Sequence, residues 1–188
     1  MNLRQLPNLI SILRILLVLP VVWALLRGDY RTALVLFMIA GLSDGLDGYL
    51  ARRYGWITRL GGLLDPLGDK LLMVCGYLTL GWIEALPGWL VGTVIARDGI
   101  IVGGTLAYRW LIGTVKTEPL LISKINTGLQ IVLVLLVILS LAGLLELPLL
   151  VKGLMYLVFV TTVMSGIAYV TLWSFRAWQA WPQRRKRT

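Results

Sequence analysis

The sequence contains no histidine and only one cysteine among its 188 residues. The absence of histidine excludes histidine-based catalytic triads and zinc sites that need imidazole ligands. The single cysteine, Cys75, cannot form an internal disulfide, and because it lies in an apolar run we interpret it as a packing residue. A metal ion in this chain would therefore be held by oxygen ligands.

Charged residues are also scarce. They make up 14% of the chain, hydrophobic residues make up 58%, and the mean hydropathy is +0.83. A soluble domain carries about 25% charged residues. No soluble core of this chain length could bury so much apolar sequence, so we expect lipid to be its solvent. We expect residues 1–188 to form a single membrane domain.

Acidic residues are fewer than basic residues. Nine Asp and Glu stand against 18 Lys and Arg, which gives a formal net charge of +9. In a soluble protein this excess would suggest nucleic-acid binding. Here the basic residues lie mostly in short connections and at the chain ends, where they set orientation and contact anionic headgroups. We therefore expect membrane lipids as partners, and no nucleic acid.

Six apolar runs follow one another along the chain. They cover residues Leu9–Leu26, Thr32–Ala51, Leu60–Ile83, Trp89–Ile112, Leu120–Leu141 and Leu149–Trp173. Each is about long enough to cross a ~30 Å hydrocarbon core as a helix. The sequence predicts an all-α integral membrane protein with six transmembrane helices. The opening "PNLISILR" predicts an N-terminal interfacial segment.

The distribution of basic residues predicts the orientation of the chain. Lysine and arginine gather in the second and fourth connections and at both ends, whereas the third connection has none. Cytoplasmic loops carry an excess of these residues. We therefore expect both termini and the second and fourth connections to lie in the cytoplasm.

Four aspartates interrupt this apolar chain. Asp44 and Asp47 are spaced i, i+3 near the end of the second run, and Asp65 and Asp69 are spaced i, i+4 near the start of the third. Residues at these spacings share one helical face. The short connection makes the two helices antiparallel neighbours, so the acidic faces can meet just below the cytoplasmic surface. Because a charge in hydrocarbon is costly, such acids mark a functional site by default.

Four converging carboxylates without histidine or cysteine form a hard-oxygen site. Their mutual repulsion is relieved by one or two divalent cations, Mg²⁺, Mn²⁺ or Ca²⁺. Two such ions can clamp a phosphoryl group during in-line displacement, and Arg52 offers a donor for a diphosphate. A purely structural alternative is that the acids pair with neighbouring basic residues while glycines pack the helices closely.

Two other classes of membrane protein fit these acids less well. An ion-coupled transporter also carries intramembrane acids, but it is expected to place them near the midplane between internal repeats. These four acids lie at one end of two consecutive helices, and no second half repeats them. A scaffolding membrane protein has no chemistry that requires four intramembrane carboxylates.

The residues around the four aspartates resemble the signature of a known family. The stretch "DGLDGYLARRYGWITRLGGLLDPLGD" fits the pattern D-x2-D-G-x2-A-R-x8-G-x3-D-x3-D at every fixed position. Those positions are Asp44, Asp47, Gly48, Ala51, Arg52, Gly61, Asp65 and Asp69. The pattern resembles the signature of the CDP-alcohol phosphotransferases, integral membrane enzymes that build phospholipids. The six runs and the "PNLISILR" opening resemble that family too.

The resemblance implies a reaction and a set of roles. A CDP-linked lipid, usually CDP-diacylglycerol, would donate its phosphatidyl group to an alcohol while CMP leaves. The two metal ions would be held by Asp44, Asp47 and Asp65, with Asp69 near them. Asp69 would also be the general base for the acceptor hydroxyl. The CDP pocket would be lined by Gly48, Ala51, Arg52 and Gly61, with Arg52 on the diphosphate. The resemblance further implies a homodimer.

The acceptor alcohol must be read from other residues. Arg97, Arg109 and Lys124 could gather around an anionic acceptor, although snorkelling towards the membrane surface would also explain Arg109 and Lys124. "RD" followed by "ISKINT" resembles the cardiolipin synthase branch of the family, whose acceptor is phosphatidylglycerol. The phosphatidylglycerophosphate synthase branch, which uses glycerol 3-phosphate, usually has Arg-Glu and then G-K-x-K-T.

The sequence departs from that second pattern, with Asp98 in place of the glutamate and Asn126 in place of the second lysine. A small dianion favours more cations than a singly charged lipid does. We therefore predict phosphatidylglycerol as the acceptor, with glycerol 3-phosphate as the alternative. We expect a bacterial cytoplasmic membrane protein with its active site facing the cytoplasm.

Overall fold

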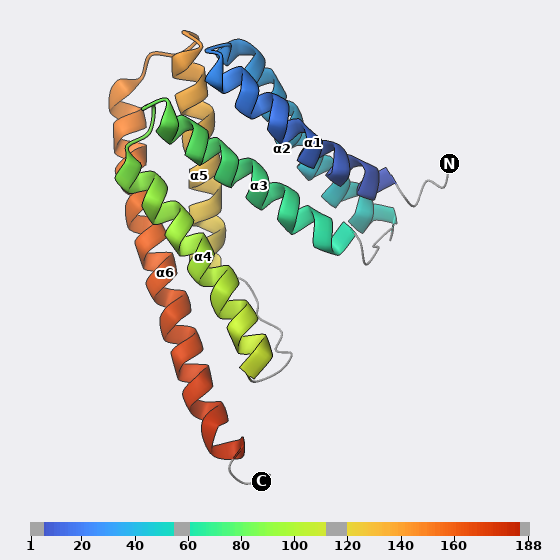
Figure 1. Cartoon of the computed structure of the whole chain (residues 1–188), viewed down its shortest axis with the longest axis vertical. Helices are drawn as coiled ribbons and strands as arrows, with labels where there is room; N and C mark the ends of the chain where they lie inside the picture. The colour runs from blue at the N-terminus through green and yellow to red at the C-terminus, as the bar shows by residue number, and fades with distance from the viewer. Residues whose placement is uncertain (1–5, 55–60, 112–119, 185–188) are drawn as a thin grey trace. The chain divides into compact units, whose positions relative to one another are not determined.

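The structure is a computed structural model of the chain, and it describes residues 6–54, 61–111 and 120–184. These ranges contain six α-helices and no strand (Figure 1). The helices are α1 (Leu6–Leu26), α2 (Tyr30–Tyr54), α3 (Gly61–Trp82), α4 (Gly88–Leu111), α5 (Leu121–Leu141) and α6 (Pro148–Arg184). The predicted all-helical fold is thus confirmed, with one helix for each apolar run.

Three of these helices end in the same backbone motif. The residue after the cap takes a positive φ at Gly28 (75°), Glu84 (60°) and Gly143 (68°). After α1, the N–H of Gly28 donates to the carbonyl of Leu25, and the next N–H donates to that of Ala24. This pair of bonds is the Schellman motif, which satisfies the last carbonyls of a helix. The same pair of hydrogen bonds closes α3 and α5.

Asp29 caps the start of α2. Its Oδ1 accepts a hydrogen bond from the backbone N–H of Thr32 at 3.2 Å, which satisfies one orphan donor of the first turn. Bonds from the hydroxyl and the N–H of Thr32 hold the pKa of this exposed carboxyl below its ordinary value. The connection between α1 and α2 is therefore fixed from both sides, by the motif at Gly28 and by this cap.

The chain divides into two compact units. The first comprises Met1–Pro87 and Val134–Pro148, and the second comprises Gly88–Leu133 and Leu149–Thr188. In the first unit α1 packs against both α2 and α3. The buried face of α1 includes Ser11, Arg14, Val18, Val21 and Leu25, spaced alternately by three and four residues, and Ala24 beside Leu25 is buried too. That spacing is the seam of closely packed helices.

The second unit contains α4, most of α5 and nearly all of α6. Trp89 of α4 packs edge-to-face on Phe159 of α6, with ring centroids 5.2 Å apart, and lies 6.0 Å from Tyr156. Between the helices lie buried polar side chains from all three, at Arg97, Asp98, Asn126, Gln130, Thr162 and Ser165. The interior of this unit is therefore held by hydrogen bonds as well as by apolar packing.

The helices present apolar side chains to their surroundings. Leu19 of α1 and Leu149 of α6 are 72% and 86% exposed. Within the described residues, Leu121–Leu141 and Pro148–Phe175 are long and apolar enough to cross a membrane, and Ile10–Leu26, Tyr30–Ser43 and Lys70–Trp82 are shorter apolar helices. These faces are consistent with a membrane protein, as the composition predicts.

Candidate active site

The four aspartates lie on the helices that the sequence predicts. Asp44 and Asp47 belong to the second half of α2, and Asp65 and Asp69 belong to the first half of α3. Both helices pack against α1, so the two acid-bearing stretches belong to the same unit (Figure 1). Gly48, Ala51 and Arg52 continue α2 beyond its acids, and Gly61 begins α3.

The side chains of these eight signature residues lie outside the described part of the chain, so their mutual contacts stay a prediction. Among the side chains that are described, no three histidine, cysteine or acidic residues gather closely enough to hold a metal ion. The metal-site prediction therefore rests on the aspartates. Their donor chemistry, carboxylate oxygen without nitrogen or sulfur, fits hard divalent cations such as Mg²⁺ and Mn²⁺.

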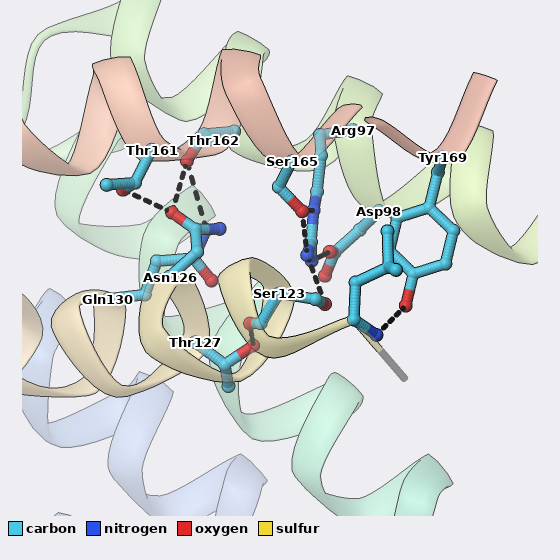
Figure 2. Close-up of polar contacts among 11 residues, drawn as sticks. Arg97, Asp98, Ser123, Asn126, Thr127, Gln130, Thr161, Thr162, Ser165 and Tyr169 are labelled. Carbon is cyan, nitrogen blue, oxygen red and sulfur yellow. Dashed lines mark hydrogen bonds and ion pairs between the residues drawn. The ribbon is translucent and has the colours of Figure 1, made fainter. Parts of the chain in front are cut away.

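Arg97, predicted to bind the acceptor, lies inside the second unit and is only 4% exposed. Its Nη1 forms an ion pair with Asp98 Oδ1 at 2.7 Å. Its Nη2 donates to Ser165 Oγ of α6 at 2.7 Å and to Ser123 Oγ of α5. Figure 2 shows the guanidinium between these three side chains. One arginine thus ties α4 to both neighbouring helices.

A second polar group lies one turn further along α5. Asn126 is fully buried, and its Oδ1 accepts hydrogen bonds from the hydroxyls of Thr161 (2.8 Å) and Thr162 (2.9 Å) on α6. Gln130 donates to the same Thr162 hydroxyl at 3.4 Å (Figure 2). No described residue bonds to Asn126 Nδ2. In this structure Asn126 therefore joins helices, whereas the sequence indicated only that it replaces a lysine.

An open groove of about 430 Å³ runs between α4 and α6. Arg97 lines it, together with Ala96 and Ile100 of α4 and Gly166, Ile167 and Val170 of α6. Most of these side chains are aliphatic or small. A buried cation beside an apolar groove is the arrangement that suits a molecule with an anionic group and an acyl chain.

The other two predicted acceptor residues, Lys124 and Arg109, lie near helix ends. Lys124 follows Ser123 in the first turn of α5, and its side chain is exposed. Arg109 belongs to the last turn of α4, but its side chain lies outside the described residues. The structure thus brings Arg97 and the start of α5 together through Ser123, and leaves Lys124 at the surface.

Sequence reasoning did not assign four residues that the structure singles out, which are Ser165, Thr161, Thr162 and Arg14. Ser165 bonds to Arg97 across 68 residues of sequence, and the Thr161–Thr162 pair bonds to Asn126 across 35 and 36. Arg14 is the largest fully buried side chain of the described residues. A signal existed for Arg14, because a charge within an apolar run is costly. None existed for the serine and threonines, which are common in membrane helices.

Comparison with known proteins gives one family. The model of the CDP-alcohol phosphatidyltransferase family matches residues 4–178. The chain is 33% identical over 186 residues to a probable cardiolipin synthase (CMP-forming) of Drosophila melanogaster, covering 90% of this chain and 58% of the relative. It is 35% identical over 144 residues to the cardiolipin synthase (CMP-forming) of Rattus norvegicus, covering 68% and 48%.

A relative with a different name is similar to the same degree. The chloroplastic CDP-diacylglycerol–glycerol-3-phosphate 3-phosphatidyltransferase 1 of Oryza sativa subsp. japonica is 36% identical over 147 residues, covering 69% of this chain and 45% of the relative. The chain thus spans about half the length of the curated relatives it matches.

Proposed function

The chain belongs to the CDP-alcohol phosphatidyltransferase family, and from this premise we propose that it transfers a phosphatidyl group from CDP-diacylglycerol to an alcohol, with release of CMP. The observation that carries the proposal is the complete family signature, placed on α2 and α3 of one compact unit. We propose phosphatidylglycerol as the acceptor, which makes the product cardiolipin.

The signature residues take definite roles in this proposal. Asp44, Asp47, Asp65 and Asp69 hold two divalent cations, which neutralise charge on the transferred phosphoryl group when they are bound. Arg52 binds the diphosphate, and Gly48, Ala51 and Gly61 line the pocket for CDP. Asp69 accepts the proton of the acceptor hydroxyl as its oxygen attacks the phosphorus of the phosphatidyl group. The bond from that phosphorus to the CMP oxygen breaks, and CMP leaves.

The apolar groove supports a lipid acceptor. A small dianion such as glycerol 3-phosphate needs cations and no apolar surface, whereas Arg97 is already paired with Asp98 and borders aliphatic side chains. Phosphatidylglycerol offers one negative charge and two acyl chains. We propose that Arg97, Arg109 and Lys124 serve its headgroup. The similarity to a glycerol-3-phosphate enzyme of rice keeps phosphatidylglycerophosphate synthesis as the second candidate.

The proposal extends to the setting of the enzyme. The six helices all cross the bilayer, and residues 1–188 act as one membrane domain, with "PNLISILR" entering at the interface. Both termini and the active site face the cytoplasm of a bacterium, since basic residues gather at the chain ends and in the connections on that side. The chain works as a homodimer. A cysteine-accessibility map of the connections tests the orientation.

The reaction is tested with purified full-length protein in detergent. CMP release is measured with CDP-diacylglycerol and Mg²⁺ or Mn²⁺, adding either phosphatidylglycerol or glycerol 3-phosphate. We expect CMP with phosphatidylglycerol, no CMP after chelation by EDTA, and loss of turnover in Asp69→Asn. Asp29→Asn is the matched control, because Asp29 is exposed, lies outside the signature and keeps a good cap as asparagine.

Each outcome decides between the candidates. CMP with glycerol 3-phosphate alone would mean that Asp98 and Asn126 do not select the acceptor. CMP with neither alcohol, from folded protein, would count against the reaction itself. An ion-coupled transporter would release no CMP and would show metal-ion or proton flux in proteoliposomes instead.

A further inference from the structure

We propose that Arg14 of α1 is a charged member of the active site: its guanidinium lies against the turn of α3 that carries Asp65 and Asp69, and it is the internal counter-charge of the four aspartates. In this role it is a positioning residue, which holds the acidic helix ends together before metal ions bind. The inference rests on the proposed metal site, and its test separates the two.

The first observation is burial. Arg14 is 0% exposed, although α1 presents large apolar side chains to its surroundings. An arginine on such a helix could extend its long side chain towards a membrane surface. It instead belongs to the buried face of α1, one turn from Ser11 and Val18. A fully buried arginine persists where it has acidic or hydrogen-bonding partners, because the desolvation of its charge is costly.

The second observation is the place of its guanidinium. A Cβ added to Gly68 would lie 3.6 Å from Arg14 Cδ and 3.7 Å from Arg14 Nη1. The arginine therefore lies in van der Waals contact with this position, where a side chain longer than alanine at residue 68 would extend. Gly68 follows Asp65 by three residues and precedes Asp69 by one, so the positive charge lies against the helical turn that bears both acids.

The third observation brings in α2. The short connection at Gly28 makes α1 and α2 antiparallel, and the two helices pack against each other (Figure 1). Arg14 lies twelve residues before the end of α1, and Asp44 lies fourteen residues after the start of α2. At about 1.5 Å per residue both are roughly 20 Å from the connection. The acids of α2 and α3 and the arginine of α1 are thus at one level.

This arrangement gives Arg14 an effect with a definite sign. Without metal ions, its charge offsets part of the repulsion among the four carboxylates and stabilises the fold. With metal ions, it repels them, so it weakens their binding. Arg14 would therefore keep the metal-free enzyme folded and raise the metal concentration that the site requires.

The test compares Arg14→Met, which keeps length and apolar volume, with Arg14→Lys, which keeps the charge. The melting temperature of full-length protein in detergent is measured in EDTA and across a Mn²⁺ titration, without substrate. We expect Arg14→Met to melt at a lower temperature in EDTA, and Mn²⁺ to recover that loss with a titration midpoint about tenfold lower than in the native chain. Arg14→Lys should stay close to the native chain in both measurements.

A role in packing alone predicts a different result. Arg14→Met would then lose the same melting temperature at every Mn²⁺ concentration, with an unchanged midpoint. That result would overturn the proposal. Coupling is measured directly by combining Arg14→Met with Asp69→Asn, where we expect non-additive melting temperatures, and with the exposed Asp29→Asn, where we expect additivity.

Gly68 offers a second route if Arg14→Met does not fold. Gly68→Ala adds only an ordinary van der Waals contact and should leave the Mn²⁺ midpoint unchanged. Gly68→Leu displaces the guanidinium and should lower the midpoint as Arg14→Met does. Equal midpoints in both Gly68 variants would contradict the proposal. CMP release by the native chain is recorded alongside, so a failure of the reaction is distinguished from a failure of this inference.

Discussion

Glu84 holds the backbone conformation that Gly28 and Gly143 hold at the other two helix ends, with φ at 60°. A residue with a Cβ pays about 1 kcal/mol for this left-handed conformation, which glycine adopts without strain. We predict that Glu84→Gly raises the unfolding free energy by up to about 1 kcal/mol, while Gly28→Ala and Gly143→Ala lower it. Thermal unfolding in detergent checks the signs. A lower melting temperature for Glu84→Gly would show that its side chain has a role that the backbone does not reveal.

Asp29 gives a prediction about pH at the same scale. Because the hydroxyl and N–H of Thr32 lower its pKa in the folded state, the charged carboxylate stabilises the fold at any pH above the unfolded-state pKa. This contribution is lost as the pH falls through the folded-state pKa, in acid below about pH 4. We expect Asp29→Ala to melt at a lower temperature than the native chain at neutral pH, and the difference to shrink in acid. A difference in melting temperature that persists unchanged at low pH would contradict this prediction.

Single residues also show what a sequence can and cannot reveal about this site. Asp44, Asp47, Asp65 and Asp69 could be placed on helix faces because helical spacing is periodic and a charge in an apolar run is conspicuous. Ser165 could not be linked to Arg97, since a serine in a helix carries no signal of a partner 68 residues away. The contact exists only because α4 and α6 pack together.

At the scale of elements, the ends of the helices depart from the ends of the apolar runs. The sixth apolar run ends at Trp173, but α6 continues to Arg184, and α2 continues three residues past Ala51 to Tyr54. Hydropathy measures where lipid can surround a helix, whereas arginine and glutamine propagate a helix well in water. The positions of the helices were therefore predictable from the apolar runs, and the lengths of the helices were not.

The Arg97 network makes a prediction about how three helices hold together. Replacing Arg97 by methionine removes the bonds to Ser123 and Ser165 and takes the ion-pair partner from the buried Asp98. We expect Arg97→Met to cost about 3 kcal/mol of unfolding free energy. The double variant Arg97→Met/Asp98→Asn should recover part of that cost, because it also removes the buried carboxylate charge that Arg97 offsets. Chemical unfolding of the single and double variants measures these free energies. Equal stability of the two variants would contradict the prediction.

At the scale of the whole molecule, the two proposed halves of the reaction lie in different compact units. The eight signature residues lie between Met1 and Pro87, and Arg97, Arg109 and Lys124 lie between Gly88 and Leu133. The sequence could indicate both sets of residues, because each set forms a local pattern. It could not show that the chain divides into two compact units between these sets, since the division follows from packing.

This division predicts that donor and acceptor binding can be changed separately. We expect Lys124→Met to raise the KM for phosphatidylglycerol about tenfold and to leave the KM for CDP-diacylglycerol unchanged. Lys152→Met is a matched control, because Lys152 is an exposed lysine on α6 outside every proposed site. Initial rates of CMP release at varied concentrations of each lipid give both constants. A rise in the KM for the donor as well would argue against separate binding regions.

The close approach of α4 and α6 at Gly104 has a consequence for how such a sequence can change over time. A Cβ at residue 104 would overlap the ring of Trp173. A larger residue at 104 therefore requires the Trp173 ring to move or to be replaced by a smaller side chain. Replacing the tryptophan first leaves a cavity, whereas replacing the glycine first forces the ring out of its place. The order in which this pair of residues is substituted therefore affects the cost of each step.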